Sequence, residues 1–155
     1  MTEDDPSRPI AWAEQMQRAH DRLREALALA DESLDAGTVP EGVDVLLYCW
    51  GFCTALTGHH RAEDETLFPA VLGDRADLSD VVARLMQDHS MIEHLLTSLR
   101  HAVETGADPH TLRQHLDGVG AVMESHFRYE ERELLGPLVG LDLEAAPEQA
   151  LGPLA

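Results

Sequence analysis

Two short stretches of the sequence carry the same pair of metal-binding side chains. His59 is followed four residues later by Glu63, and His126 is followed four residues later by Glu130. Four residues of an α-helix correspond to about 40° of rotation and about 6 Å of rise, so both members of such a pair can reach one ion. Imidazole and carboxylate groups together suit iron, manganese and zinc. Both stretches are therefore candidate metal-binding segments.

The spacing of two further histidines repeats along the chain. His20 precedes His59 by 39 residues, and His89 precedes His126 by 37 residues. The two histidine–glutamate pairs are themselves 67 residues apart. A single histidine on an apolar helix face is more often a hydrogen-bonded core residue than a ligand. The duplicated spacing instead favours a metal site to which two similar halves of the chain contribute.

Four segments with the three- and four-residue periodicity of amphipathic helices must position these side chains. The boundaries follow glycine and proline signals: Pro9 to Ala36 before Gly37, Val43 to Phe68 before Pro69 and Gly73, Ser79 to just before Gly106, and Asp108–Pro109 to just before Gly136–Pro137. Serine or aspartate before a helix, proline in its first turn and glycine after its end are typical of such boundaries. The alternation typical of β-strands is absent from the sequence.

These signals predict an all-α fold, an up-down-up-down antiparallel four-helix bundle. The length of 155 residues suits a single domain over residues 1–155. We expect the bundle to occupy about residues 9–139 and the proline- and alanine-rich residues 140–155 to form a loosely packed tail.

The positions of the four histidines within their helices predict that they lie at one height. His20 and His89 lie about ten residues after the expected starts of their helices, whereas His59 and His126 lie about eight or nine before the ends. In an alternating bundle, the starts of the first and third helices lie beside the ends of the second and fourth. The imidazoles are therefore expected in one layer, about 12–17 Å from one end of the bundle.

The predicted metal ligands are the four imidazoles and two carboxylates of this layer, namely His20, His59, Glu63, His89, His126 and Glu130. A closed structural zinc site takes four ligands and usually includes cysteine. Six ligands without a thiolate therefore indicate two metal ions. Open positions on such a pair can bind O₂, peroxide or NO, and the pair can exchange one or two electrons.

A second reading of the second helix remains open. His60 and Asp64 are also four residues apart, and they are displaced by about 100° from His59 and Glu63. We favour His59, because Glu63 matches Glu130 in residue type. His60 is then expected next to the metal site or at its rim.

Composition excludes several classes of function. Aspartate and glutamate number 29 against 11 lysines and arginines, which gives a net charge of −18 and argues against nucleic acids and anionic membranes. The longest uncharged run, Val45–Gly58, is too short to span a bilayer. The acidic N-terminus does not resemble a secretory signal, and Cys49 and Cys53 form neither a redox C-x-x-C motif nor a disulfide framework. We therefore expect a cytoplasmic protein with reduced cysteines.

Four segments resemble the helices of a known family. AHDRLREAL, LTGHHRAEDETLFP, LMQDHSMIEHLL and ESHFRYEERELL are similar to those of the hemerythrin-like, or HHE cation-binding, domain, over about residues 9–139. The resemblance implies an up-down four-helix bundle around two non-haem iron ions joined by an oxo or hydroxo bridge. It also implies that the six predicted residues are the ligands, with Glu63 and Glu130 bridging the two irons.

The third helix departs from the classical oxygen-carrying hemerythrins. These have a second histidine four residues after the first, where this sequence has Glu93, and His94 follows one residue later, turned by about 100°. Three roles stay open for Glu93: a further carboxylate ligand, an acid next to the ligands, or an exposed residue. Reversible O₂ carriage is correspondingly less well supported than in the classical members.

The resulting functional expectation is a di-iron protein that binds O₂, peroxide or NO, with redox activity such as catalase-like peroxide decomposition. One alternative is a protein that binds, stores or senses O₂, NO or iron without turnover, and another is a bundle that its metals merely stabilise. The sequence shows no nucleotide-binding loop and no attached output domain. The absence of both from the sequence favours redox chemistry or small-ligand binding by the isolated domain.

Overall fold

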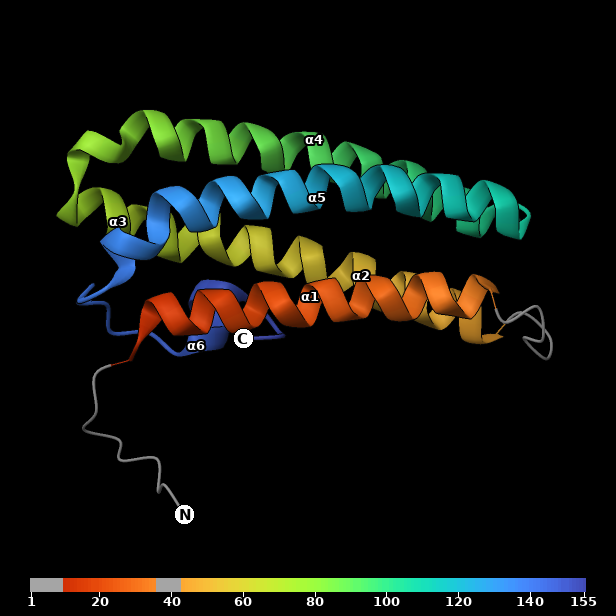
Figure 1. The fold of residues 1–155 in the computed structure, drawn as a ribbon, viewed down its shortest axis with the longest axis horizontal. Coiled ribbons are helices and arrows are strands. Elements are labelled where there is room, and N and C mark those ends of the chain that lie inside the picture. Colours follow the sequence, from red (N-terminus) through yellow and green to blue (C-terminus); the bar gives the residue numbers. More distant parts are fainter. Residues whose placement is uncertain (1–9, 36–42) are drawn as a thin grey trace, which may run out of the picture.

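The computed structural model describes residues 10–35 and 43–155, and within these ranges every regular element is helical. Four long segments account for most of the chain: α1 (Trp12–Asp35), α2 (Val43–Ala62) with its continuations, α4 (Ser79–Glu104) and α5 (Pro109–Leu138). Figure 1 shows these segments lying side by side, each running in the opposite direction to the one before it. The all-α prediction is confirmed for the described residues.

The second long segment changes its helical type beside the candidate site. After α2 the chain passes through a π-helical turn, η2 (Glu63–Leu67), into α3 (Phe68–Asp74) without a break. Phe68 donates its N–H to the carbonyl of Glu63, five residues earlier, which is the π-helical bond. Pro69 lacks the N–H of a regular helix, and its ring would crowd the carbonyl four residues before it. The wider turn lets the helix continue past Pro69, where the sequence predicted its end.

Other predicted boundaries had mixed outcomes. Asp108 caps α5 as expected, because its side chain accepts from the Thr111 N–H at 2.8 Å. Ser79 is the first residue of α4 and not its cap, since a short 3₁₀ turn, η3 (Ala76–Leu78), leads directly into the helix. The predicted stop before Gly136–Pro137 was also wrong, because α5 continues to Leu138. The expected start at Pro9 and the end before Gly37 lie outside the described residues.

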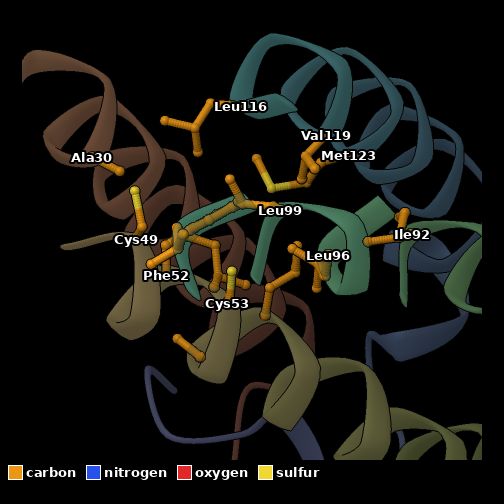
Figure 2. Close-up of a cluster of buried hydrophobic side chains, with 14 of the residues drawn as sticks. Ala30, Cys49, Phe52, Cys53, Ile92, Leu96, Leu99, Leu116, Val119 and Met123 are labelled. Atoms are coloured by element: carbon orange, nitrogen blue, oxygen red, sulfur yellow. The ribbon is translucent and has the colours of Figure 1, made fainter. Parts of the chain in front are cut away.

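The hydrophobic core consists of two clusters at different heights along the helices. The larger cluster, shown in Figure 2, brings apolar side chains of all four long segments together, among them Phe52, Leu96, Leu99 and Met123. The smaller cluster contains Trp12, Leu67, Phe68, Leu85 and Leu134. Burial of such a side chain contributes roughly 1.5–3 kcal/mol. On α1, on α4 and on α2 with its continuations, the predicted ligands lie between the residues of one cluster and those of the other, and on α5 only Phe127 of the larger cluster lies among them.

The uncharged stretch in α2 belongs to the larger cluster. Cys49, Phe52 and Cys53 are almost completely buried, and both cysteines are free thiols, as the sequence predicted. Burial raises the pKa of each thiol to about 11, so both remain protonated at neutral pH. Across the described residues, no helix combines the length and the hydropathy that crossing a membrane requires.

The prediction of a loosely packed tail over residues 140–155 was wrong. Ala150 and Leu151 have no exposed surface, and Leu141 is 7% exposed. All three belong to the smaller core cluster, and a short helix, α6 (Pro147–Leu151), packs against α1 and α2 (Figure 1). The apolar residues of this segment complete a cluster that the long helices leave partly uncovered, and Pro147 starts a helix instead of breaking one.

The packed tail leads to a prediction about stability. Replacing Leu151 by alanine in metal-free protein should lower the free energy of unfolding by about 2–5 kcal/mol, because a buried leucine leaves a cavity. The control is Val139→Ala, at a side chain that is 73% exposed, which should change stability by no more than about 0.5 kcal/mol. Urea unfolding followed by circular dichroism measures both, and equal small effects would show that the segment is not packed.

Candidate metal centre

The structure brings the six predicted residues together in one buried layer between the two core clusters. Together with His60, they supply donor atoms that form two groups, and within each group the atoms lie within 4.8 Å of one another. The first group consists of His60, Glu63, His89 and His126, and the second of His20, His59, Glu63 and Glu130. Each of these residues is at most 5% exposed. Glu63 belongs to both groups, so the layer contains two adjacent candidate sites that share a carboxylate.

Both carboxylates lie between the two groups of imidazoles. Glu63 Oε1 is 3.1 Å from His59 Nε2 and 3.5 Å from His89 Nε2. Glu130 Oε2 is 3.3 Å from His126 Nε2 and 3.7 Å from His20 Nε2. Each carboxylate therefore faces one imidazole of each group, which is the position that a carboxylate shared by two ions would need.

The imidazoles of His89 and His126 are held from outside by aspartates. The Nδ1–H of His89 donates to Asp64 Oδ1 at 2.8 Å, and that of His126 donates to Asp88 Oδ2 at 3.1 Å. These bonds leave both Nε2 atoms inside the layer, 3.1 Å apart. An outer acceptor of this kind fixes the tautomer and the ring orientation of a metal-binding histidine.

The imidazoles of the second group have different outer partners. The Nδ1–H of His59 donates to the main-chain carbonyl of Leu151 at 2.7 Å. His20 Nδ1 lies 3.6 Å from Glu131 Oε1, which is longer than a hydrogen bond, and Arg24 holds this carboxylate at 2.8 Å. The two groups are therefore chemically unequal even though the sequence spacing is duplicated.

His60 lies inside the layer. The sequence had favoured a place for it next to the metal site or at the rim of the site. Its ring stacks on His89 with centroids 3.9 Å apart, whereas the neighbouring His59 ring lies 5.1 Å from that of His20. Consecutive residues of a helix point about 100° apart, so α2 directs one histidine towards α1 and the next towards α4. The histidine doublet was the available sequence signal for a fifth imidazole.

The structure also separates the roles that were left open for two carboxylates. Asp64 supports His89 and belongs to neither group of donor atoms. Glu93 is partly exposed and accepts hydrogen bonds from Thr57 Oγ1 at 2.9 Å and from Arg100 at 3.0 Å. Glu93 is therefore bound in a surface network and does not replace the histidine found there in classical hemerythrins.

The donor set fits metal cations because its atoms lack other partners. Nine buried side-chain nitrogen or oxygen atoms of the described residues form no hydrogen bond, and eight of them belong to His20, His59, His60, Glu63 and Glu130. A buried polar group without a partner costs about 1–3 kcal/mol, and more if it is charged. A cation between the carboxylates and the imidazoles would compensate for this cost.

Burial shifts the pKa values of the layer strongly in the metal-free protein. It raises the pKa of Glu63 to about 7 and, together with the neighbouring Glu63, raises that of Glu130. It lowers the pKa of His59 to about 4 and that of His60 well below its usual value. Burial opposes protonation of His126 as well, but nearby Glu130, Glu63 and Asp88 outweigh it and raise the pKa to about 9. Burial also lowers the pKa of His20, so the imidazoles of His20, His59 and His60 are neutral and able to bind a metal at neutral pH.

These shifts predict how the stability of the metal-free protein changes with pH. His126 retains a proton in the folded state up to about pH 9 but loses it near pH 6.5 when unfolded, so its contribution to stability is complete below pH 6.5 and is lost as the pH rises to 9. Glu63, whose pKa rises from 4.5 to about 7 on folding, adds a change of the same sign at lower pH, between about pH 4.5 and 7. The free energy of unfolding should therefore fall between pH 6.5 and 9.

Urea unfolding of chelator-treated protein at several pH values measures this change. The metal-loaded protein provides the comparison, because its ligands must be deprotonated and its stabilisation by metal should grow with pH. Parallel pH dependence of the two forms would contradict the prediction.

Comparison with known proteins identifies the family to which the protein belongs. The hemerythrin HHE cation-binding domain model matches residues 13–138, which include all the donor residues of both groups. No curated protein and no solved structure gives a significant match. Because the family match covers most of the chain, the protein belongs to the hemerythrin HHE cation-binding domain family.

Proposed function

We propose that the protein holds two non-haem iron ions and binds O₂, peroxide or NO at this pair. The observation that carries the proposal is the sharing of Glu63 between two groups of buried donor atoms. One ion would be held by His60, His89 and His126, and the other by His20 and His59. Glu63 and Glu130 would serve both ions, since each carboxylate faces an imidazole of each group.

The type and number of the donors favour iron over structural zinc. The layer offers five imidazoles and two carboxylates, whereas a structural zinc ion takes four ligands and usually cysteine. Cys49 and Cys53 belong to the larger apolar cluster and to neither donor group. The free, buried thiols also favour a reducing compartment such as the cytoplasm.

The alternate direction of the four long segments supports the up-down-up-down bundle that we propose for this chain (Figure 1). In this arrangement each long segment contributes at least one imidazole from its middle. The larger core cluster covers one side of the layer along the helices, and the smaller cluster covers the other side. Phe127 of the larger cluster stacks on His20 with ring centroids 3.9 Å apart. This packing excludes bulk water and fixes the direction of the imidazole.

We further propose redox activity, such as peroxide decomposition, for the iron pair. Two irons can supply one- or two-electron chemistry to a small ligand bound at an open position. A surface hollow of about 540 Å³ reaches the layer at His60 and His89 and is also lined by Thr57, Asp64 and Ser90. It gives a small molecule a route to the buried donors while the rest of the layer remains covered.

Three substitutions test the assignment of donors to the two ions. Glu63→Ala should weaken the binding of both irons, because this carboxylate serves both groups. His60→Ala should weaken only one. His94→Ala is the matched control, since this exposed histidine lies outside both groups and its replacement should leave two irons per chain. Iron content and the oxo-to-iron absorption band measure the outcome, and selective loss of one ion in Glu63→Ala would contradict sharing.

The proposed redox activity predicts that peroxide consumption depends on iron content. Samples reconstituted with increasing iron, up to two ions per chain, should remove peroxide at rates that rise with the fraction of chains holding both ions. Metal-free protein in the same buffer is the control for reactions of the polypeptide itself. Equal rates in metal-free and iron-loaded samples would show that the centre binds ligands without turnover.

A further inference from the structure

The segment after α5 contributes the only main-chain partner in the described hydrogen bonds of the layer. We call residues 146–155 the strap, because this segment crosses the outer side of α1 and α2 (Figure 1). The carbonyl oxygen of Leu151, at the end of α6, accepts the Nδ1–H of His59 at 2.7 Å. A carbonyl oxygen can only accept, so the proton must be on Nδ1 and Nε2 carries the lone pair that a metal needs.

Two glycines allow the strap to lie directly on α2. Gly152 has φ +87° and ψ −172°, a conformation that is essentially restricted to glycine. A Cβ atom at Gly152 would lie 2.7 Å from both the nitrogen and the Cα of His59. On the other side of the contact, a Cβ atom at Gly58 would lie 3.0 Å from the Pro153 ring. Main chain therefore packs against main chain at the residue that carries the ligand.

The strap is also fastened to the other helix of the second group. Arg22 of α1 lies two residues after His20 in the sequence, and it donates to the carbonyl oxygen of Leu154 at 2.8 Å. Ala150 and Leu151 are completely buried in the smaller core cluster. The segment is thus held by a hydrogen bond and by apolar packing, independently of its bond to His59.

The first group does not depend on the strap in this way. His89 and His126 are held by Asp64 and Asp88, which are part of the four long helical segments. The strap also packs against η2, but among the described hydrogen bonds of the layer it makes a direct bond only to His59, so we expect its displacement to act on His59 first.

We propose that the strap positions His59 through the Leu151 carbonyl and thereby sets the affinity of the His20–His59 group for its ion, independently of the His60–His89–His126 group. This inference rests on the proposed two-metal function. Its basis is the combination of the 2.7 Å bond, the glycine-only conformation beside it and the absence of strap contacts in the hydrogen bonds described for the first group.

Gly152→Ala is the variant that tests the proposal, because the added methyl group must displace the strap from His59. Loss of an outer hydrogen bond to a ligating histidine typically lowers metal affinity by about 10- to 100-fold. We expect such a loss for one of the two ions and no change for the other, measured by metal titration. In metal-free protein, ¹⁵N NMR of the His59 ring should show reduced population of the Nδ1–H form.

Gly140→Ala is the matched control. Gly140 also has positive φ, +79°, but no atom lies within 4 Å of a Cβ placed there. This substitution introduces comparable backbone strain without a contact to His59, and should leave both affinities and the tautomer unchanged. Equal effects of the two substitutions would overturn the proposal, as would wild-type affinities and tautomer in Gly152→Ala.

A milder pair of variants covers the case in which Gly152→Ala does not fold. Arg22→Ala removes the tether to Leu154 at an exposed side chain, and Arg18→Ala removes an exposed arginine one turn earlier on the same helix. Only Arg22→Ala should weaken the affinity for one ion, and identical affinities in the two variants would overturn the proposal. If the wild-type protein binds no metal pair, the proposed function fails, and the NMR comparison still decides whether the strap orients His59.

Discussion

The burial of two carboxylates among five imidazoles is the constraint on which the rest of the structure depends. Glu63 and Glu130 are completely buried, and neither forms a hydrogen bond that would compensate for the loss of water. Two adjacent carboxylates in an apolar interior hold protons or require positive charge. The raised pKa values describe the first case, and the binding of cations would provide the second. The fold must therefore hold an unfavourable polar layer in place until cations bind to it.

The core is arranged around this requirement. An apolar cluster lies at each side of the layer, so the free energy from burying leucine, phenylalanine and tryptophan side chains offsets the cost of the polar groups between them. The outer nitrogens of three imidazoles are bonded to Asp64, Asp88 and the Leu151 carbonyl, which direct the inner nitrogens towards the carboxylates. Apolar packing thus supplies stability, and the outer hydrogen bonds supply orientation.

The spacing of the predicted ligands is duplicated along the sequence, but the two halves of the site differ. The histidine doublet gives α2 two imidazoles, one for each group, and raises the first group to three. The outer partners also differ, since aspartates support the first group and a main-chain carbonyl supports His59 in the second. An aspartate partner makes an imidazole a stronger donor than a carbonyl partner does. Two ions at this centre would therefore differ in their surroundings and in the affinity with which they are bound.

The sequence by itself determined the helical class of the protein and the six residues that meet in the buried layer. Both follow from local periodicity, because the spacing of His59 and Glu63, or of His126 and Glu130, fixes their relative direction on any regular helix. Only the tertiary structure decided that His60 faces inward, because its direction depends on which neighbours surround α2. Only the tertiary structure also revealed the packed strap, since the bond from His59 to Leu151 uses a main-chain oxygen, which every residue possesses and no sequence pattern distinguishes.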